Sequence, residues 1–489
     1  MAENNIAMMP NYYDIIIIGA GLSGIGAACH LTRKNPEKSY LILESRESLG
    51  GTWDLFKYPG IRSDSDMYTF GYSFKTWDDA KSFADAPSIL TYLKEATNDY
   101  NVTNNISYNQ RATSYAFNTN DNIWTVTAVN LKTNKTNTYT SKFIFNCSGY
   151  YNYDKGYTPD YKGLSNYKGK LIHPQNWPKE LVLNDKKVVV IGSGATAVTI
   201  VPKIAEKVHH VTMLQRSPTY VGALPNKDKV AKFFKFILPK KIAHKAIRIK
   251  NVLLDMAFFN ACKKWPATMK KYIVKKAQKE LGDISVHPHF TPNYNPWEQR
   301  FCLAPDGDLF KSIRKGKASV ETAKIDRFNE TGIVLESGKK LEADIIVSAT
   351  GLRILPLGGV NISIDDVTVD ISKLFVYKGC MLSDLPNLFL FVGYTNASWT
   401  LKSDLTSEYI TRVLNYMDKN SFQSFCPKTR GINLEPTPLL NLNSGYIHRA
   451  RNILPNQGDK APWRVYQNYI LDYKMLRIDK INDSFAVFN

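Results

Sequence analysis

The stretch YDIIIIGAGLSGIGAACHL, residues 13–31, decides the fold. Its apolar β-branched run, 15–18, is typical of a buried parallel strand. Gly19, Gly21 and Gly24 follow at the spacing G-x-G-x-x-G. The first glycine permits a tight turn, the second lets the backbone approach a pyrophosphate, and the third lets helix and strand pack closely. The stretch therefore predicts a dinucleotide-binding turn at the N-terminus of a helix.

A second predicted strand, SYLILES at residues 39–45, carries Glu44 near its end. At this distance from the glycines a carboxylate can bond both hydroxyls of an adenosine ribose. Because the strand, the three glycines and the acidic residue occur together, a nucleotide site is favoured over a glycine-rich turn that binds no ligand. The first unit therefore suits FAD.

The pattern returns in KKVVVIGSGATAVTIVPKIA, residues 186–205, with Gly192, Gly194 and Ala197 at the three positions. Here the next predicted strand ends in Gln215, and Arg216 follows directly. Loss of the carboxylate and gain of a guanidinium favour a nucleotide that carries a 2′-phosphate. The second unit is therefore predicted to bind NADPH.

Two such units in one chain predict an α/β fold with two Rossmann-like dinucleotide-binding domains that pass a hydride between their nucleotides. Between the parts of the second domain, apolar residues recur at roughly helical spacing, with Pro239 and Pro266 as breaks. They predict a helical insertion. The predicted organisation is an FAD-binding domain at 1–150 resumed at 385–489, a linker and NADP-binding domain at 151–222 resumed at 300–384, and the insertion at 223–299.

Composition narrows the class of protein. The six cysteines are scattered without a Cys-x-x-Cys pair, which argues against a zinc ribbon, a redox disulfide and a secreted disulfide framework. No metal site is predicted. There is no signal-like start and no long uninterrupted apolar run, so a cytoplasmic location is expected.

The charge is concentrated in one segment. Of the net charge of +19, residues 226–280 hold +13, because they contain sixteen Lys or Arg and three Asp or Glu. Such a segment is typical of a solvated helix face, of a surface for anionic lipid, or of a nucleic-acid surface. We predict no nucleic acid, and we keep a solvated face and peripheral membrane association as alternatives.

The segment YKGKLIHPQNWP, residues 167–178, carries a family resemblance. Its pattern Y-x-G-x-x-x-H-x-x-x-W-P is similar to the fingerprint of class B, Baeyer–Villiger flavoprotein monooxygenases, with Tyr167 where Phe is usual. Similar matches cover most of the chain and place it nearest the branch that contains ethionamide monooxygenase, a prodrug-activating enzyme. These matches are GGTW at 50–53, YPGIRSD at 58–64, YNPWEQR at 294–300 and GYTNASWTLK at 393–402.

The resemblance implies a reaction. NADPH reduces FAD, O2 adds to the reduced flavin to give a C4a-(hydro)peroxyflavin, and this species converts ketones to esters or lactones or oxygenates sulfur in sulfides or thioamides. The substrate is then a lipophilic ketone or sulfur-containing small molecule. Arg300 matches the family's active-site arginine, whose permanent charge favours an anionic peroxide. Asp64 matches the carboxylate that orients it.

The predicted sites fall into two sets. Tyr167, Gly169, His173 and Trp177 form a predicted hinge between the nucleotide domains; linker packing is the alternative. Gln299 stands where many relatives carry a lysine for the 2′-phosphate, so this role rests more on Arg216. The predicted cofactor-binding residues are Gly19, Gly21, Ser23, Gly24, Glu44, Gly51, Thr52, Trp53, Arg62, Ser63, Asp64, Ala112, Gly192, Ser193, Gly194, Ala195, Thr196, Ala197, Gln215 and Arg216.

Other functions stay open on the residues alone. A heteroatom-only N- or S-monooxygenase is disfavoured by Arg300 and by the histidine and tryptophan of the fingerprint. A membrane-associated flavoprotein NADPH oxidase would consume NADPH and release hydrogen peroxide alone. A disulfide reductase shares the two nucleotide folds but is rejected, because it needs a redox cysteine pair beside the flavin and the sequence has none.

Overall fold

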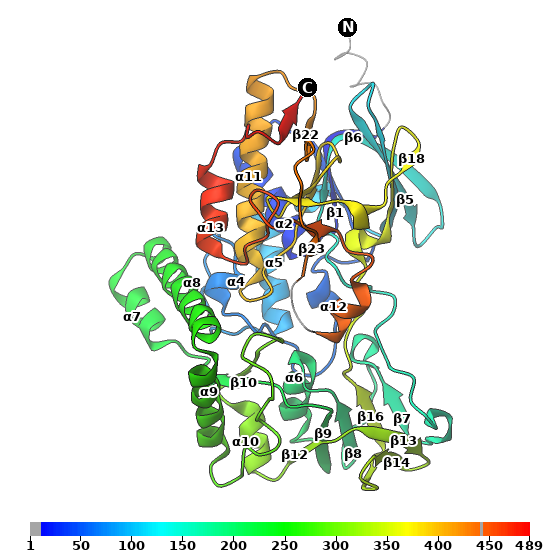
Figure 1. Cartoon of the computed structure of the whole chain (residues 1–489), viewed down its shortest axis with the longest axis vertical. Coiled ribbons are helices and arrows are strands. Elements are labelled where there is room, and N and C mark those ends of the chain that lie inside the picture. Colours follow the sequence, from blue (N-terminus) through cyan, green and yellow to red (C-terminus); the bar gives the residue numbers. More distant parts are fainter. Residues whose placement is uncertain (1–10, 441–443) are drawn as a thin grey trace.

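The first glycine-rich turn follows the central strand of a large mixed sheet, in the upper half of Figure 1. The computed structural model describes residues 11–440 and 444–489. Strand β1, Tyr12–Ile18, is parallel to β2, Tyr40–Leu43, and to β6, Thr136–Asn146. Alternate isoleucines of β1 belong to two different core clusters, because the sheet is covered on both faces.

The remaining strands extend this sheet on either side. Its order is β18-β17-β4-β5-β6-β1-β2-β3, and a branch of β21, β20 and β19 pairs from β6. The bounds are β3 Ile106–Ser107, β4 Gln110–Asn118, β5 Ile123–Asn130, β17 Asn361–Ile364, β18 Val367–Thr368, β19 Val376–Tyr377, β20 Met381–Leu382 and β21 Leu388–Leu390.

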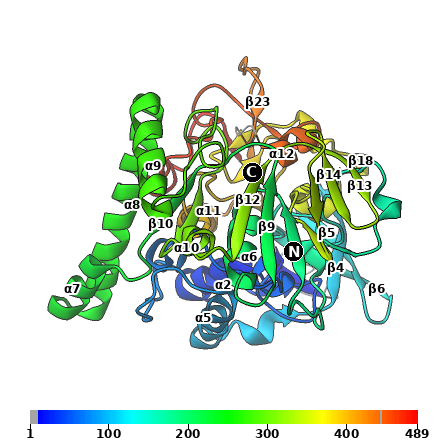
Figure 2. The ribbon, with the colours of Figure 1, turned by 90° about the horizontal axis from the view of Figure 1, so that it is seen from below.

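A second sheet holds the second glycine-rich turn, and Figure 2 shows it from below. Its order is β12-β9-β8-β16-β7, and every neighbouring pair is parallel. The strands are β7 Lys170–Ile172, β8 Lys187–Ile191, β9 His210–Gln215, β12 Ala318–Thr322 and β16 Ile345–Ser348. Two such sheets, each with a glycine-rich strand-to-helix turn, confirm the predicted α/β fold class.

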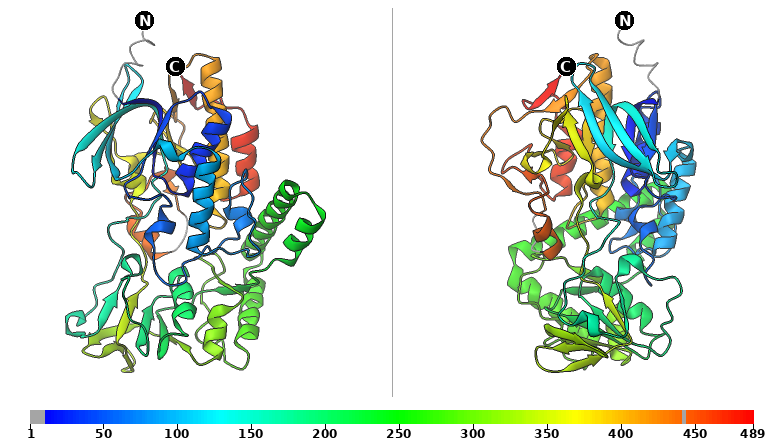
Figure 3. Two further views of the ribbon diagram at one scale, coloured as in Figure 1. Left: turned by 180° about the vertical axis from the view of Figure 1, so that it is seen from behind. Right: turned by 90° about the vertical axis from the view of Figure 1, so that its right-hand side faces the viewer.

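Helices occupy the predicted insertion. They are α7, Lys229–Ile237, α8, Lys240–Lys264, and α9, Pro266–Leu281. Pro239 is the residue before α8, and Pro266 is the first residue of α9, so both prolines separate helices as expected. In Figures 1 and 3 the α7–α8 hairpin stands away from the side of the body.

The other helices cover the sheets. Helix α11, Trp399–Lys419, packs beside α2, Leu22–Lys34, over the first sheet. The rest are α3 Thr52–Leu55, α4 Met67–Phe70, α5 Ala86–Asp99, α6 Ala195–Ile204, α10 Asp308–Arg314, α12 Gly445–Ala450 and α13 Tyr469–Tyr473. Single turns occur at η1 Thr103–Asn105, η2 Leu164–Asn166, η3 Pro174–Asn176, η4 Pro356–Gly359, η5 Ile371–Lys373 and, as a π-turn, η6 Lys474–Ile478.

Short strands complete the molecule. They are the parallel pair β10 Val221–Leu224 and β11 Cys302–Pro305, the antiparallel set β13 Ile325–Asn329, β14 Gly332–Leu335 and β15 Lys340–Glu342, and the antiparallel pairs β22 Phe425–Pro427 with β25 Ala486–Phe488 and β23 Thr437–Pro438 with β24 Asn456–Gln457.

Strand pairing corrects one predicted boundary. Strands β17 to β20, residues 361–382, pair within the first sheet, whereas the sequence assigned them to the second domain up to residue 384. The last strand of the second sheet, β16, ends at Ser348. The chain thus returns to the first sheet between residues 348 and 361. These strands are short, with few residues to form a recognisable pattern.

Candidate active site

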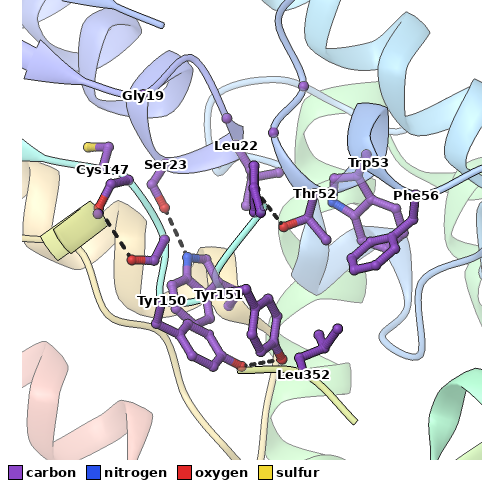
Figure 4. Close-up of a pocket in the computed structure, with 18 of the residues that line it drawn as sticks. Gly19, Leu22, Ser23, Thr52, Trp53, Phe56, Cys147, Tyr150, Tyr151 and Leu352 are labelled. Atoms are coloured by element: carbon purple, nitrogen blue, oxygen red, sulfur yellow. Dashed lines mark hydrogen bonds between the residues drawn. The ribbon is translucent and has the colours of Figure 1, made fainter. Parts of the chain in front are cut away.

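A cavity of about 410 Å³ lies where the two glycine-rich turns approach each other. Residues of both halves of the fold line it, including Gly19 and Gly21 of the first turn and Ala195 and Thr196, which begin α6 after the second turn. Figure 4 shows part of its wall, with Thr52, Trp53, Tyr150 and Tyr151 around it. The fold therefore brings together two nucleotide motifs that are distant in the sequence.

The first turn has the backbone that a bound pyrophosphate requires. Gly19 has a φ of +99°, and Gly21 is the residue before α2. A methyl group on Gly24 would lie 1.9 Å from the carbonyl oxygen of Gly19, so this glycine serves helix-to-strand packing. Gly24 does not line the cavity, whereas Ser23 does.

Glu44 directly follows β2 and lines the same cavity. Its carboxylate accepts hydrogen bonds from the backbone N–H of Ala20 at 2.6 Å and of Arg46 at 2.9 Å. Burial raises the pKa of Glu44, and these two N–H donors oppose that shift. The carboxylate is thus held in place with acceptor capacity left for ribose hydroxyls.

The segment at 50–53, which leads into α3, lies close to the first turn. A methyl group on Gly21 would lie 3.6 Å from the Cα of Gly51, which shows how near the two backbones come. The Thr52 and Tyr153 hydroxyls lie 3.0 Å apart. Trp53 packs edge-on against Phe70, with ring centroids 5.4 Å apart. All the residues of this segment line the cavity, as does Ala112 of β4.

Arg300 and Asp64 form an ion pair on the cavity wall. Nη2 of Arg300 donates to Oδ2 of Asp64 at 2.7 Å. The Asp64 carboxylate raises the pKa of Arg300 well above its ordinary value, and burial opposes this. The guanidinium therefore keeps its proton at any working pH. Its side chain is 40% exposed, and it lines the cavity.

Arg62 and Ser63 directly precede Asp64 and also line the cavity. The Arg62 guanidinium makes a two-pronged ion pair with Asp308, at 2.5 and 3.2 Å. Asp308 begins α10, which belongs to the second half of the fold. Arg62 therefore joins the two halves beside the site, in addition to its predicted cofactor role.

The second turn is also open towards a ligand. Gly192 has a φ of +132°, and a methyl group there would lie 2.4 Å from the carbonyl oxygen of Ala349. A methyl group on Gly194, the residue before α6, would meet no atom within 4 Å. The Ser193 and Thr219 hydroxyls lie 2.7 Å apart. Ala197 is buried, so it packs the helix and does not reach the cavity.

Gln215 and Arg216 differ from each other in setting. Gln215 is buried, and its amide nitrogen donates to the carbonyl oxygen of His289 at 2.7 Å and to the Thr322 hydroxyl at 2.9 Å. Its amide thus has structural partners. Arg216, directly after β9, is exposed. Neither lines the cavity, so a 2′-phosphate would meet Arg216 at the surface.

The predicted hinge packs where the chain crosses between the sheets. Residues 150–157 and 351–355 run beside each other there, joined by backbone hydrogen bonds. The backbone N–H of Gln175 donates to Nδ1 of His173, so Nε2–H of this ring donates to the carbonyl oxygen of Gly351, at 3.1 Å. Burial lowers the pKa of His173, which favours this neutral ring.

The other fingerprint residues anchor the same segment to the second sheet. The Tyr167 hydroxyl donates to the carbonyl oxygen of Ala343 at 2.9 Å, and a methyl group on Gly169 would collide with this tyrosine. Trp177 packs against the core of the second sheet. None of the four fingerprint residues lines the cavity.

Sequence reasoning missed an aromatic part of the wall. Tyr150 and Tyr151 follow Cys147-Ser148-Gly149, and their hydroxyls lie 2.7 Å apart (Figure 4). Trp399 stacks on Tyr150, and its indole N–H donates to the Ser23 hydroxyl at 2.9 Å. Tyr446 lies close enough to Arg300 to influence its pKa. In open α/β sheets, ligands bind beyond the carboxyl ends of the parallel strands. The position of the two tyrosines after β6 was therefore a signal that could have placed them in the site.

The described ranges show neither a metal-binding cluster, nor a disulfide bond, nor a helix that could span a membrane. In 11–440 and 444–489 no cluster of three or more His, Cys, Asp or Glu residues is arranged to hold a metal ion. The six cysteines are buried and free. Over the same ranges, no helix has both the length and the apolar character needed to cross a bilayer.

Known proteins resemble this chain over nearly its whole length. Residues 13–421 match the family described as flavin-binding monooxygenase-like. FAD-containing monooxygenase EthA of Mycobacterium tuberculosis (strain ATCC 25618 / H37Rv) is 48% identical, over 97% of each chain. A probable FAD-binding monooxygenase, AlmA of Acinetobacter baylyi (strain ATCC 33305 / BD413 / ADP1), is 46% identical, over 98% of this chain and 97% of its own.

Among solved structures, an oxidized steroid monooxygenase bound to NADP has a similar fold. It has a TM-score of 0.71 and 21% identity, over 86% of this chain and 88% of its own. A crystal structure of OTEMO in complex with FAD and NADP has a TM-score of 0.69 and 23% identity, over 86% and 87% of the two chains. These likenesses agree with the fold class deduced from the strand pairing.

Proposed function

The chain belongs to the flavin-binding monooxygenase-like family, and on this premise we propose that it is a monooxygenase dependent on FAD, NADPH and O2. The proposed reactions convert ketones to esters or lactones and oxygenate sulfur in sulfides or thioamides, a substrate class that includes prodrugs. The observation that carries the proposal is the Arg300–Asp64 pair on the wall of a cavity that is lined by the first glycine-rich turn and by the start of α6, directly after the second.

The residues of the first turn fit FAD. Residues at the start of α2 line the cavity, where their backbone N–H groups would bind the pyrophosphate, and Glu44 offers acceptor oxygens for a ribose. Gly51 and Thr52 line the same cavity and would also contact the bound FAD. When bound, FAD reduced by NADPH supplies the electrons that activate O2.

The second turn fits NADPH in the same way. Gly194 leaves open space before α6, and Ala195 and Thr196 reach the cavity. Arg216 is the proposed partner of the 2′-phosphate, and His173 is the proposed hinge anchor between the nucleotide domains. The domain limits of the sequence analysis are proposed with the change at 348–361 that strand pairing requires.

Arg300 supplies the electrostatic part of the proposed mechanism. Its guanidinium is a fixed cation beside the reacting atoms, so it stabilises negative charge on oxygen without moving a proton. Asp64 holds the guanidinium in one orientation.

A smaller cavity of about 70 Å³ adjoins Arg300 and is the proposed place of the substrate. Its lining is mainly apolar, which favours a lipophilic molecule. The lining includes Leu357, Leu390, Phe391, Leu439, Tyr446 and Leu454. A carbonyl group here would lie between apolar walls and one guanidinium.

The basic segment at 226–280 adds a proposal about location. Its net charge of +13 supports peripheral association with a membrane surface, which suits an enzyme for lipophilic substrates.

The test is turnover by the purified FAD-loaded enzyme. We expect NADPH consumption to rise with a lipophilic ketone and to match the ester or lactone formed, measured by gas chromatography. A sulfide should give the sulfoxide in a parallel reaction. Sulfoxide without any ester would favour the heteroatom-only monooxygenase. Hydrogen peroxide as the sole product, equal to the NADPH consumed, would favour the oxidase and contradict the proposal.

A further inference from the structure

The α7–α8 hairpin presents apolar side chains to solvent. On α7, Phe236 is 88% exposed and Phe233 57%, and Val230 and Ile237 are also exposed. Val230, Phe233 and Ile237 recur at intervals of three and four residues, so they share one face of the helix. The opposite side packs on the body, because Ala231 and Phe234 contact its core. The aromatic side of α7 therefore faces away from the body.

Helix α8 continues this arrangement. Ile242, Ile249 and Leu253 are each at least half exposed, and their spacing of seven and four residues makes one stripe. The other side of the helix, with Ala243 and Ile247, is buried against the body. We use the name outer apolar face for the seven exposed residues described above, namely Val230, Phe233, Phe236, Ile237, Ile242, Ile249 and Leu253.

Lysines border the outer apolar face. Lys232 lies on α7, and Lys241 and Lys245 lie on α8; all three are exposed. They belong to the segment that carries a net charge of +13. An ordinary solvated helix would place charged residues at its most exposed positions, whereas here the stripe that faces solvent is apolar. The lysines of this surface fit a partner with negative charges on its outside, and the apolar stripe fits an apolar layer below those charges.

We propose that the outer apolar face docks on an anionic phospholipid bilayer. Phe233 and Phe236 enter the boundary between headgroups and acyl chains, and the lysines bind lipid phosphates. Nucleic acid would use the lysines but offers no apolar layer for the phenylalanines. A second copy of this chain would bring the same lysines against one another, which like-charge repulsion opposes.

The inner side of α8 connects this surface to the candidate site. Val252 packs in one cluster with Tyr394 and Leu401, and Tyr394 lines both cavities. One helix thus has lipid on its outer side and the wall of the site on its inner side. This connection between bilayer and site rests on the proposed function. It implies that the enzyme takes lipophilic substrates that are dissolved in the bilayer.

The test is co-sedimentation of the FAD-loaded enzyme with vesicles of phosphatidylcholine, with and without phosphatidylglycerol. The wild type should bind the anionic vesicles, and added salt should weaken binding. Phe236→Ser should lower the affinity about tenfold, because the phenyl group no longer enters the lipid. Combined Lys232→Gln, Lys241→Gln and Lys245→Gln changes should lower it on the order of a hundredfold.

A matched control is Val367→Ser, because Val367 is 69% exposed in β18 of the first sheet, outside the hairpin. It should bind vesicles like the wild type. All variants should oxidise NADPH with a water-soluble ketone at the wild-type rate. If the wild type bound vesicles but did not turn over the ketone, the proposed function would be overturned and the docking proposal would still hold.

Four results would overturn the docking proposal. The wild type could fail to bind anionic vesicles at low salt, or Phe236→Ser could bind them as well as the wild type. Sedimentation velocity could instead show self-association that Phe236→Ser abolishes, which would assign the face to a second copy. Tighter binding to duplex DNA than to anionic vesicles would assign the lysines to nucleic acid.

Discussion

Arg248 of α8 donates to the carboxylate of Asp404 in α11 at 2.9 Å, and this buried pair fixes the helical insertion to the helix that covers the first sheet. Arg248 also donates to the carbonyl oxygens of Tyr68 and Gly71. Burial alone would raise the pKa of Asp404, but the hydrogen bond from His30 and the charge of Arg248 lower it. The hairpin is therefore held by a buried ionic network.

Breaking this network should be costly. We expect Arg248→Met to destabilise the protein by about 3–5 kcal/mol, because it leaves a buried carboxylate without its cation. The matched control is Lys240→Met, which breaks the exposed pair with Asp78 and should cost less than about 1 kcal/mol. Urea unfolding and amide hydrogen exchange in α8 measure both. Equal effects of the two changes would refute the assigned role of Arg248.

Removal of the cation at the candidate site should separate reduction from oxygenation. We expect Arg300→Ala to lower ester formation by about a hundredfold or more, because the site loses its stabiliser of negative charge on oxygen. NADPH should still reduce the flavin, as stopped-flow absorbance would show. Asp64→Asn keeps the shape and should give an intermediate loss. Ester formation at the wild-type rate in Arg300→Ala would disprove the proposed mechanism.

Arg216 should determine the preference between NADPH and NADH. We expect Arg216→Ala to raise KM for NADPH about tenfold, because a charge-assisted bond to the 2′-phosphate is lost. KM for NADH should not change. Arg327→Ala removes an exposed arginine from β13 and serves as the control in the same steady-state assay. An equal rise in KM for both nucleotides would exclude a phosphate contact.

Gly156 should be required for the position of His173. A methyl group on Gly156 would lie 2.1 Å from Cε1 of His173 and push the ring from Gly351. Gly156→Ala should therefore match His173→Ala, with slower flavin reduction and more hydrogen peroxide per NADPH. Once the ring is gone, adding Gly156→Ala should change little further. Additive losses in the double variant would show that Gly156 acts independently of His173.

His244 should make stability depend on pH. Burial lowers its pKa to about 4, and the charges of Arg248 and Lys235 contribute. Between the ordinary histidine pKa and this value the unfolded chain binds a proton that the folded chain does not, so stability falls as the pH falls. We expect a loss of about 2 kcal/mol at pH 5 that His244→Gln lacks. Thermal melting at pH 7 and 5 compares them, and parallel pH dependence would contradict the prediction.

Local motifs made part of the site predictable from sequence. Gly19 and Glu44 line the cavity because short-range spacing fixes them directly after strands β1 and β2, and the resemblance indicated residues 50–53. The Arg300–Asp64 pair was accessible only through the resemblance, because the two residues are far apart in the sequence. For the same reason, the sequence could not predict that Gln215 bonds to His289 and Thr322.

The missed features share a physical cause. Strands β17 to β20 have two to four residues each, too few for a period-two pattern to emerge. Tyr150 and Tyr151 carry no motif, and their hydroxyl contact appears only once the chain crosses between the sheets. Tertiary packing therefore determined both the domain boundary and the aromatic wall.

The pairing of β6 has a consequence for synthesis on the ribosome. β5 covers one edge of β6 only up to Ser141, and β21 pairs with its last residues, Ile144–Asn146. These backbone groups stay unpaired until the whole second sheet and the helical hairpin have emerged. A nascent chain stalled before Leu388 thus exposes an apolar strand edge, the kind of template that invites aggregation and chaperone binding.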